Sequence, residues 1–405
     1  MCREFFYGDR PMSLALPQWL TLVPTATWNR PARLLHWLTF FWLVCGLLIL
    51  LSASYDLALN ESGNGFAYLI RQGVWLILGL LGFSWAIATP IQRFARWAPW
   101  GMGLCLVGLA LTLVAGATIN GASRWLVIGP LQIQPSELMK PCLILQGAVV
   151  FGSWFRLSWA QRGFWLAMFL LTLGIILKQP NLSTATLCGS LLWIIALAAG
   201  LPLAQLLLTV IGGGAIGVVS VFRNSYQMER ILSFLNPWRD PLDKSYQLVQ
   251  SLLAIGSGGT WGTGYGLSVQ KLSYLPIQNT DFIFAVYAEE FGLVGSLLFL
   301  LFLCCFGTVG FWVALRSRRV LNQLVATGCT TLLVLQSLLN IGVASGALPT
   351  TGLPLPFISY GGNALLSSLF VAGLLIRVAL EMDEEIANSP GPTTPLKTIR
   401  RRSPA

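Results

Sequence analysis

Leu35-His-Trp-Leu-Thr-Phe-Phe-Trp-Leu-Val-Cys-Gly-Leu-Leu-Ile-Leu-Leu-Ser-Ala-Ser54 is a run of 20 residues that contains no Asp, Glu, Lys or Arg. A helix of about 20 apolar residues is long enough to cross the hydrocarbon core of a bilayer. Nine further apolar segments follow, at 70–89, 98–118, 139–155, 163–179, 182–200, 203–222, 282–313, 321–345 and 357–380. The sequence therefore predicts an all-α polytopic membrane protein of about ten transmembrane helices, with a long loop between the seventh and the eighth.

The composition excludes an ordinary soluble enzyme. Of the 405 residues, 55% are hydrophobic and 10% are charged, whereas soluble proteins carry about 25% charged residues. A surface with so little charge suits lipid rather than water. The eight cysteines show no C-x-x-C spacing and the chain has a single histidine, His36. Neither a disulfide framework nor a histidine metal site is therefore expected.

The net charge of +10 is distributed unevenly along the chain. Basic residues in short loops are retained on the cytoplasmic side of a membrane. Ten spans place both termini on one side, and sixteen of the 25 basic residues fall there. They are Arg3, Arg10, Arg30, Arg33, Arg93, Arg96, Arg156, Arg162, Arg316, Arg318, Arg319, Arg377, Lys397, Arg400, Arg401 and Arg402. We expect cytoplasmic termini, and a basic excess that orients the chain in the membrane rather than binding nucleic acid.

The predicted spans divide the chain into three parts. A cytoplasmic segment, 1–34, has no apparent cleavable signal peptide and precedes a transmembrane domain, 35–380, whose outer loops are 118–139 and 223–280. A cytoplasmic tail, 381–405, follows, and from Asn388 onward it is rich in Pro, Thr and Arg, which is typical of disorder. The glycine-rich run Gly256–Gly266 matches neither the dinucleotide-binding pattern nor the P-loop, so nucleotide binding is not supported.

Ionisable groups at membrane depth are costly and often mark functional sites. One group of polar residues in the outer loops contains Arg124, Gln134, Glu137 and Lys140. Glu137 and Lys140 are three residues apart and can pair on one face of a helix. A structural ion pair and a polar substrate pocket both fit this pattern.

A second polar group lies directly before the eighth span and contains Lys271, Asn279 and Asp281. Asp281 at a helix N-terminus can cap the first N–H groups or can act as a catalytic carboxylate, and the residues alone leave both roles open. Glu290 follows nine residues later, about 180° around a helix. A straight helix therefore cannot bring Asp281 and Glu290 into one pocket.

Four motifs in these segments carry a resemblance to a known family. They are Arg124-Trp125 with Gln134-Pro-Ser-Glu137 and Lys140; Tyr246-Gln247 with Gln250-Ser251 and Ala254–Gly259; Leu275-Pro276 with Thr280-Asp-Phe-Ile-Phe-Ala285 and Glu289-Glu290; and the run Leu348–Gly362, which includes Ser359. From the first span to about residue 380 the chain resembles the SEDS family (shape, elongation, division and sporulation) of bacterial cell-wall polymerases. The run Gly266–Pro276 is more similar to the FtsW division branch than to the RodA elongation branch.

The resemblance implies a glycosyltransferase that polymerises lipid II into a growing glycan strand, at the outer face of the bacterial cytoplasmic membrane and at the division septum. It implies a class B penicillin-binding protein and other division proteins as partners. Asp281 matches the family's essential aspartate, and Lys140 matches a lysine near it. The family often has His where Asn279 stands and Glu where Ser273 stands, so no accessory carboxylate is expected at 273.

Glycosyl transfer needs a base for the acceptor hydroxyl and positive charge for the diphosphate leaving group. We expect Asp281 to be the base. The residues expected to bind substrate are Arg124, Gln134, Glu137, Lys140, Lys271, Asn279 and Ser359. No tightly bound cofactor is expected, although a divalent cation, Mg²⁺ or Mn²⁺, can share the diphosphate charge. A lipid II flippase and a non-enzymatic scaffold of the division complex are the alternative functions.

Overall fold

The computed structural model describes residues 28–119, 122–129, 131–179, 181–243, 245–272, 274–276 and 278–387 of the 405-residue chain. The predicted cytoplasmic N-terminal segment is described only from Trp28. The tail that was expected to be disordered, from Asn388 onward, lies outside the described residues.

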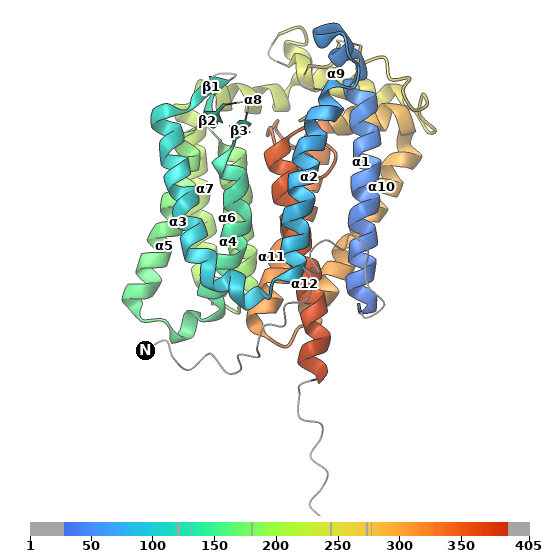
Figure 1. Cartoon of the computed structure of the whole chain (residues 1–405). Helices are drawn as coiled ribbons and strands as arrows, with labels where there is room; N and C mark the ends of the chain where they lie inside the picture. Colours follow the sequence, from blue (N-terminus) through green and yellow to red (C-terminus); the bar gives the residue numbers. More distant parts are fainter. Residues whose placement is uncertain are drawn as a thin grey trace, which may run out of the picture.

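Each of the ten apolar segments forms a helix, and the helices run side by side as a bundle (Figure 1). The ten are α1 (Arg30–Ser62), α2 (Ala67–Ala88), α3 (Ile91–Ala115), α4 (Pro135–Gly152), α5 (Trp159–Lys178), α6 (Leu182–Ala198), α7 (Leu203–Arg223), α10 (Ile283–Arg316), α11 (Val320–Ala344) and α12 (Gly362–Ala387). Among the described residues, eight of these helices are long and apolar enough to cross a membrane. The other two, α4 and α6, are shorter, with 18 and 17 residues. The prediction of a polytopic helical membrane protein is confirmed.

Two predicted span boundaries are wrong for local reasons. α1 begins at Arg30 because the Asn29 side chain accepts the N–H of Ala32 at 2.9 Å and a proline occupies the first turn, both of which favour a helix start. α12 begins at Gly362 rather than at residue 357. Phe357 has a φ of 64°, which a right-handed helix does not accommodate. Residues 345–361 therefore form a connection between α11 and α12 instead of part of a span.

The helical fold also contains a small antiparallel sheet, which was not predicted from the sequence. β1 (Ala117–Ile119), β2 (Ala122–Ile128) and β3 (Leu131–Ile133) form a sheet in the order β1-β2-β3 within the first outer loop. Leu126 pairs with Ile133, and Ile128 pairs with Leu131 across the turn at Gly129. β-Branched residues on either side of a glycine turn favour such a hairpin, and this local signal was overlooked beside the hydropathy of the flanking spans.

The second outer loop is largely helical. It contains α8 (Ser225–Leu235), a short 3₁₀ helix at Pro237–Arg239 and α9 (Tyr246–Ser257). α8, α9 and the sheet lie at the same end of the bundle (Figure 1). α9 packs against α10 and α11 through buried residues that include Leu248 and Ala254. The predicted long connection between the seventh and eighth spans is thus an ordered layer over one end of the helices.

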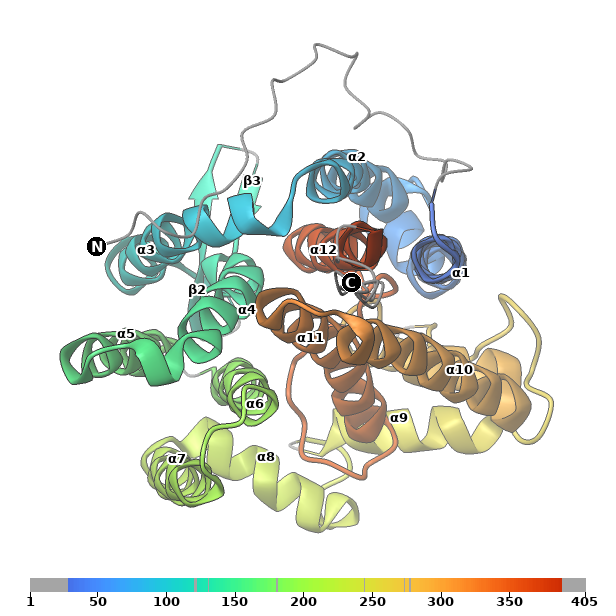
Figure 2. The same cartoon turned by 90° about the horizontal axis from the view of Figure 1, so that it is seen from below.

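The centre of the bundle is formed by α4, α11 and α12. α12 packs along α2, and α11 contacts α4, α6, α10 and α12. Seen from the other end, α7 lies at the edge of the bundle beside α6 and α8 (Figure 2). Most residues of α11 and α12 are buried, whereas nearly all of α7 is exposed.

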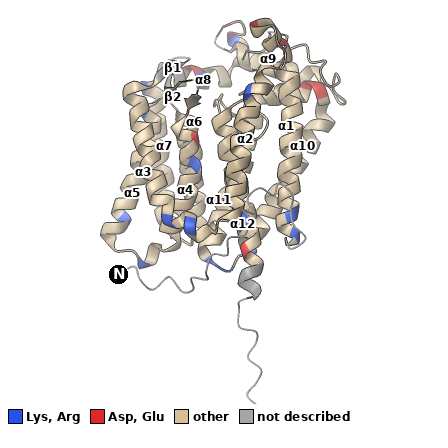
Figure 3. Cartoon of the chain, viewed as in Figure 1, with Lys and Arg blue, Asp and Glu red and all other residues tan. Residues whose placement is uncertain are grey.

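Charged residues gather at the two ends of the helices and leave the middle of the bundle mostly apolar (Figure 3). The end at which α1 begins and α12 ends carries ten of the described arginines. They are Arg30, Arg33, Arg93, Arg96, Arg156, Arg162, Arg316, Arg318, Arg319 and Arg377. The sheet, α8 and α9 lie at the opposite end.

α10 is broken at Gly292, where the backbone (φ 65°, ψ −163°) is not helical. The backbone groups left without helical partners bond to the glycine-rich run. We call these bonds the glycine clip. The N–H groups of Thr263 and Gly264 donate to the carbonyls of Glu289 and Glu290 at 2.9 and 3.0 Å. The N–H groups of Leu293 and Val294 donate to the carbonyls of Gly259 and Thr260 at 2.9 and 3.1 Å. A Cβ atom at Gly262 would lie 2.1 Å from the carbonyl oxygen of Glu290. Only glycine allows this close approach.

Candidate active site

A cavity of about 200 Å³ lies at the end of the bundle that carries the sheet and α8. Its walls come from β2, the start of α6, α8, α11 and the connection after α11. The polar residues that line it include Arg124, Asn181, Ser183, Gln227, Arg230 and Thr350. Two arginines in a small cavity make it suited to an anionic group.

The two arginines come from different outer segments. Arg124 lies on β2, and its Nε donates a hydrogen bond to the carbonyl of Gln179 at 3.1 Å, just before α6. Arg230 lies on α8, and its Nη1 donates to the carbonyl of Thr350 at 3.1 Å. Each guanidinium is therefore fixed by a backbone carbonyl next to the cavity.

Asp281 is held by its backbone two residues before α10. Its carbonyl accepts a hydrogen bond from Asn340 Nδ2 on α11 at 2.9 Å. The carbonyl of Thr280 accepts the hydroxyl of Ser359 at 2.6 Å. The N-cap of α10 is Phe282, with no side-chain capping bond. The N-cap position is therefore occupied by Phe282 and not by Asp281.

The Asp281 carboxylate approaches Arg230 at Gly352. A Cβ atom there would lie 3.5 Å from Oδ2 of Asp281 and 3.9 Å from Nη1 of Arg230, and the neighbouring Thr351 and Leu353 line the cavity. Burial raises the pKa of the Asp281 carboxyl above its ordinary value, while the positive charges of Arg230 and Arg124 lower it. A carboxylate of raised basicity next to cations that favour its charged form is suited to accept a proton.

Lys140 and Glu137 form a buried ion pair in α4. Lys140 Nζ lies 2.7 and 2.8 Å from the two carboxylate oxygens of Glu137 and 2.9 Å from Oε1 of Gln336 on α11. Lys140 is 1% exposed. The predicted pairing of Glu137 with Lys140 is present. The charges that lower the pKa of the buried Asp281 carboxyl are those of Arg230 and Arg124. Gln336 also donates to the carbonyl of Pro354 at 2.7 Å, so the pair supports the connection beside the cavity.

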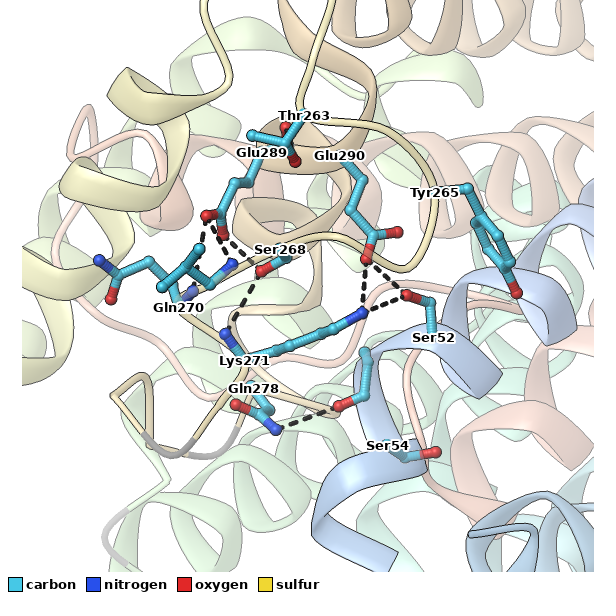
Figure 4. A network of polar contacts seen from close by, with 12 residues as sticks. Ser52, Ser54, Thr263, Tyr265, Ser268, Gln270, Lys271, Gln278, Glu289 and Glu290 are labelled. Carbon is cyan, nitrogen blue, oxygen red and sulfur yellow. Dashed lines mark hydrogen bonds and ion pairs between the residues drawn. The ribbon is translucent and has the colours of Figure 1, made fainter.

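Lys271 belongs to a different polar network, shown in Figure 4. Its Nζ donates to Oε1 of Glu290 at 2.9 Å and to the hydroxyl of Ser52, on α1, at 3.0 Å. Lys271 does not line the cavity. The structure therefore does not bring Lys271 together with Arg124 and Asp281, and it keeps Glu290 apart from Asp281, as the helical angle predicts.

The remaining predicted residues have backbone or connecting roles. Ser359 is buried and bridges two backbone segments, because its hydroxyl also accepts the N–H of Leu355 at 2.8 Å. The carbonyl of Asn279 accepts the N–H of Tyr360 at 2.8 Å. Gln134 occupies the N-cap position of α4 without a side-chain capping bond. Ser359 and Asn279 thus hold the segment that ends at Asp281.

Of the polar residues that line the cavity, only Arg124 was expected to bind substrate, and the missed residues include Gln227 and Arg230 on α8. Gln227 is 5% exposed, and its Nε2 has no hydrogen-bond partner among the described residues, although its Oε1 accepts the hydroxyl of Ser220. No local sequence signal marks them, because Arg230 meets the cavity through the carbonyl of Thr350, which lies 120 residues away.

The described residues contain no group of three or more His, Cys, Asp or Glu side chains that could hold a metal ion. The carboxylate of Asp281 faces the arginine charge of the cavity instead of further acidic ligands. These residues do not fit a divalent cation held by the protein, so no step of the mechanism below depends on one.

Comparison with protein families gives one match across most of the chain. The model of the FtsW/RodA/SpoVE family, described as cell cycle protein, matches residues 32–384. A probable peptidoglycan glycosyltransferase FtsW of Synechocystis sp. is 53% identical over 358 residues, which cover 88% of this chain and 91% of the relative. The corresponding putative protein of Mesostigma viride is 48% identical, with 88% and 86% covered.

Solved structures give the same result. One chain of a peptidoglycan synthase complex, described as coordinating polymerization and crosslinking, matches with a TM-score of 0.70 and 31% identity, covering 86% of this chain and 97% of that one. The rod shape determining protein RodA of Thermus thermophilus matches with a TM-score of 0.59 and 30% identity, covering 84% and 95%. The agreement of the family model, the relatives and the fold over the whole bundle shows that this chain belongs to the FtsW/RodA/SpoVE family of cell cycle proteins.

Proposed function

We propose that this protein is a peptidoglycan glycosyltransferase of the division branch, which polymerises lipid II at the outer face of the cytoplasmic membrane. The observation that carries the proposal is the position of Asp281, a carboxylate fixed by its backbone beside a cavity that contains two arginines. The names of the relatives support the reaction class, since FtsW of Synechocystis is described as a peptidoglycan glycosyltransferase.

In the proposed reaction, Asp281 removes the proton from the 4-hydroxyl of the acceptor sugar. The hydroxyl oxygen attacks C1 of the donor sugar, and the bond between C1 and the diphosphate oxygen breaks. The electron pair of that bond goes to the leaving lipid diphosphate. The reaction is a single inverting displacement, since the described residues that line the cavity include no second base for a covalent intermediate.

Arg124 and Arg230 stabilise the negative charge that develops on the diphosphate. Arg230 takes the part that the sequence assigned to Lys140 or Lys271, because both lysines are already paired with buried glutamates. The arginines have two roles in this proposal. They bind the leaving group, and their charges lower the pKa of the Asp281 carboxyl and so favour its ionised form.

The orientation follows from the charges at the two ends of the bundle. The end with ten described arginines is proposed to face the cytoplasm, which places both termini inside and the cavity outside. The partner is proposed to be a class B penicillin-binding protein at the division septum, a proposal supported by the matching chain of a complex that couples polymerization to crosslinking. Participation of Mg²⁺ or Mn²⁺ stays a prediction, which a chelator titration of the polymerase activity can check.

The test is polymerisation of purified lipid II by the full chain with its partner, comparing wild type with Asp281→Asn. Loss of a general base costs roughly 10²–10⁴-fold in rate, so we expect glycan strands to be nearly absent. Asp243→Asn, an exposed carboxylate in the same outer loop, is the matched control and should polymerise normally.

The two alternative functions predict different results. Translocation of lipid II in vesicles without any polymer, even with partner present, would indicate a flippase. Full complementation of a deletion strain by Asp281→Asn would indicate a scaffold. Either result would overturn the proposal.

A further inference from the structure

The network in Figure 4 joins three parts of the chain around one buried lysine. Lys271 comes from the second outer loop, Glu290 from α10 and Ser52 from α1. Lys271 is 4% exposed and Glu290 is 1% exposed. The Ser52 hydroxyl accepts from Lys271 and donates to Glu290. A buried charge without its partner is strongly destabilising, so neither ion can leave the pair without a large cost.

Glu290 lies near the end of a short, separate piece of helix. The break at Gly292 divides α10, and the piece before it begins at Ile283. Asp281 lies just before this piece, about 13 Å from Glu290 along the axis at 1.5 Å per residue. Because the ladder of helical hydrogen bonds is interrupted at Gly292, the rest of α10 does not by itself fix the direction of the piece. Its packing against the neighbouring helices and the contacts at its two ends must do so.

The contacts at the Glu290 end are of two kinds. The glycine clip holds the backbone, and the side chains of Glu289 and Glu290 hold the outer loop. Glu289 accepts from the hydroxyl of Ser268 and from the N–H of Val269 at 3.0 Å. Figure 4 shows Glu289 and Glu290 directed toward different parts of the same loop, with Lys271 extended toward Ser52. The end of the helical piece is therefore fixed to both the loop and α1.

The loop that leads to Asp281 is fixed to α1 at a second point. Gln278 Nε2 donates to the carbonyl of Ala53 at 3.1 Å, next to Ser52 in the chain. The loop precedes Asp281 in the chain and the helical piece follows it, and both are attached to the same part of α1. The ion pair between Lys271 and Glu290 joins the loop to the helical piece.

We propose that Lys271 and Glu290 are a positioning pair that sets the place of Asp281 relative to the arginines of the cavity. This inference rests on the proposed function of Asp281 as the general base. Neither residue touches the substrate. Lys271 does not act as a diphosphate-binding lysine, because its ammonium group is enclosed by protein acceptors from α1 and α10.

The test compares Lys271→Gln, Glu290→Gln and the double variant in the full chain with its partner. Each single change leaves one buried charge without its counter-ion, and the double change restores a neutral pair that can still hydrogen-bond. Misplacing a catalytic group by about 1 Å can cost roughly 10²-fold in rate. We expect each single variant to lower kcat for lipid II polymerisation at least about tenfold with little change in KM. The double variant should recover most of the loss. Arg239→Gln, an exposed cation in the same loop, is the control and should behave as wild type.

A second measurement does not depend on catalysis. Hydrogen–deuterium exchange of peptides covering 271–282 should rise in both single variants and return toward wild type in the double variant. A double variant as inactive as Lys271→Gln, with exchange like wild type, would overturn the inference in favour of direct substrate contact. Single variants with normal kcat would overturn it as well. Failure of the proposed function is seen separately, as full polymerisation by Asp281→Asn, because the exchange pattern reports the pair whatever reaction the protein performs.

Discussion

Asp281 is governed by two opposing influences on one carboxylate. Burial removes water from the charged form and raises its pKa, whereas Arg230 and Arg124 favour the charged form and lower it. If Asp281 is the general base, as proposed, it must be deprotonated to act, and the balance of these influences then sets the acid limb of the activity profile. The pKa of Asp281 can therefore be altered by substituting an arginine, without changing the carboxylate itself.

Arg230→Gln should move the acid limb of kcat/KM to higher pH. The substitution removes a charge that lowers the Asp281 pKa, so the pKa rises and a higher pH is needed to ionise the base. The measurement is the pH profile of lipid II polymerisation, with Arg239→Gln as the exposed control. A lower plateau with an unmoved acid limb would mean that Arg230 acts on the leaving group and not on Asp281.

Single residues differ in how far the sequence alone can place them. The pairing of Glu137 with Lys140 was predictable because a spacing of three residues fixes both on one helical face. Lys271 was assigned to substrate, but its partners Ser52 and Glu290 are 219 and 19 residues away. No local pattern encodes such contacts. Arg230 was missed because its partner, the carbonyl of Thr350, lies 120 residues away.

At the scale of elements, the ten helices were predictable because each is a long apolar run. The break in α10 was not predictable. Gly292 is one glycine within an apolar segment, and the sequence alone does not distinguish it from a glycine that a helix tolerates. The break exists because a separate glycine-rich segment supplies hydrogen bonds on its flank. Only the folded arrangement shows that the two segments meet.

Gly262→Ala should destabilise the protein by about 1–3 kcal/mol, because Gly262 has a φ of 83° and a Cβ atom would meet the backbone of Glu290 at 2.1 Å. Polymerase activity should fall with it, since the clip fixes the helical piece next to Asp281. The measurement is thermal unfolding in detergent together with the polymerisation rate. Gly256→Ala is the matched control, because a Cβ atom at Gly256 meets no other atom within 4 Å. Equal stability of the two variants would contradict the role of the clip.

At the scale of the whole molecule, the two ends of the bundle differ in charge and in structure. One end carries ten described arginines, and the other carries the sheet, α8, α9 and the cavity (Figures 1 and 3). The difference is what a membrane protein needs to insert in a single orientation. The placement of basic residues along the sequence was enough to predict the difference in charge, but not the sheet or the cavity.

Reporter fusions should show the orientation directly. A fluorescent protein fused after Ala405 should be fluorescent, and alkaline phosphatase at the same position should be inactive, because both reporters would be cytoplasmic. Alkaline phosphatase inserted after Asp243, in the outer loop, should be active. Phosphatase activity at the C-terminus and its absence at 243 would reverse the proposed topology and place the cavity inside the cell.

The glycine clip also has a consequence for how the chain is assembled. Backbone groups without partners cannot remain exposed to hydrocarbon, so the broken stretch of α10 is stable in lipid only after residues 259–264 have come alongside it. Those residues precede Gly292 by about 30 positions, a short loop to close. Insertion of α10 and folding of the outer loop are therefore one cooperative event, and Asp281 reaches its place only when that event is complete.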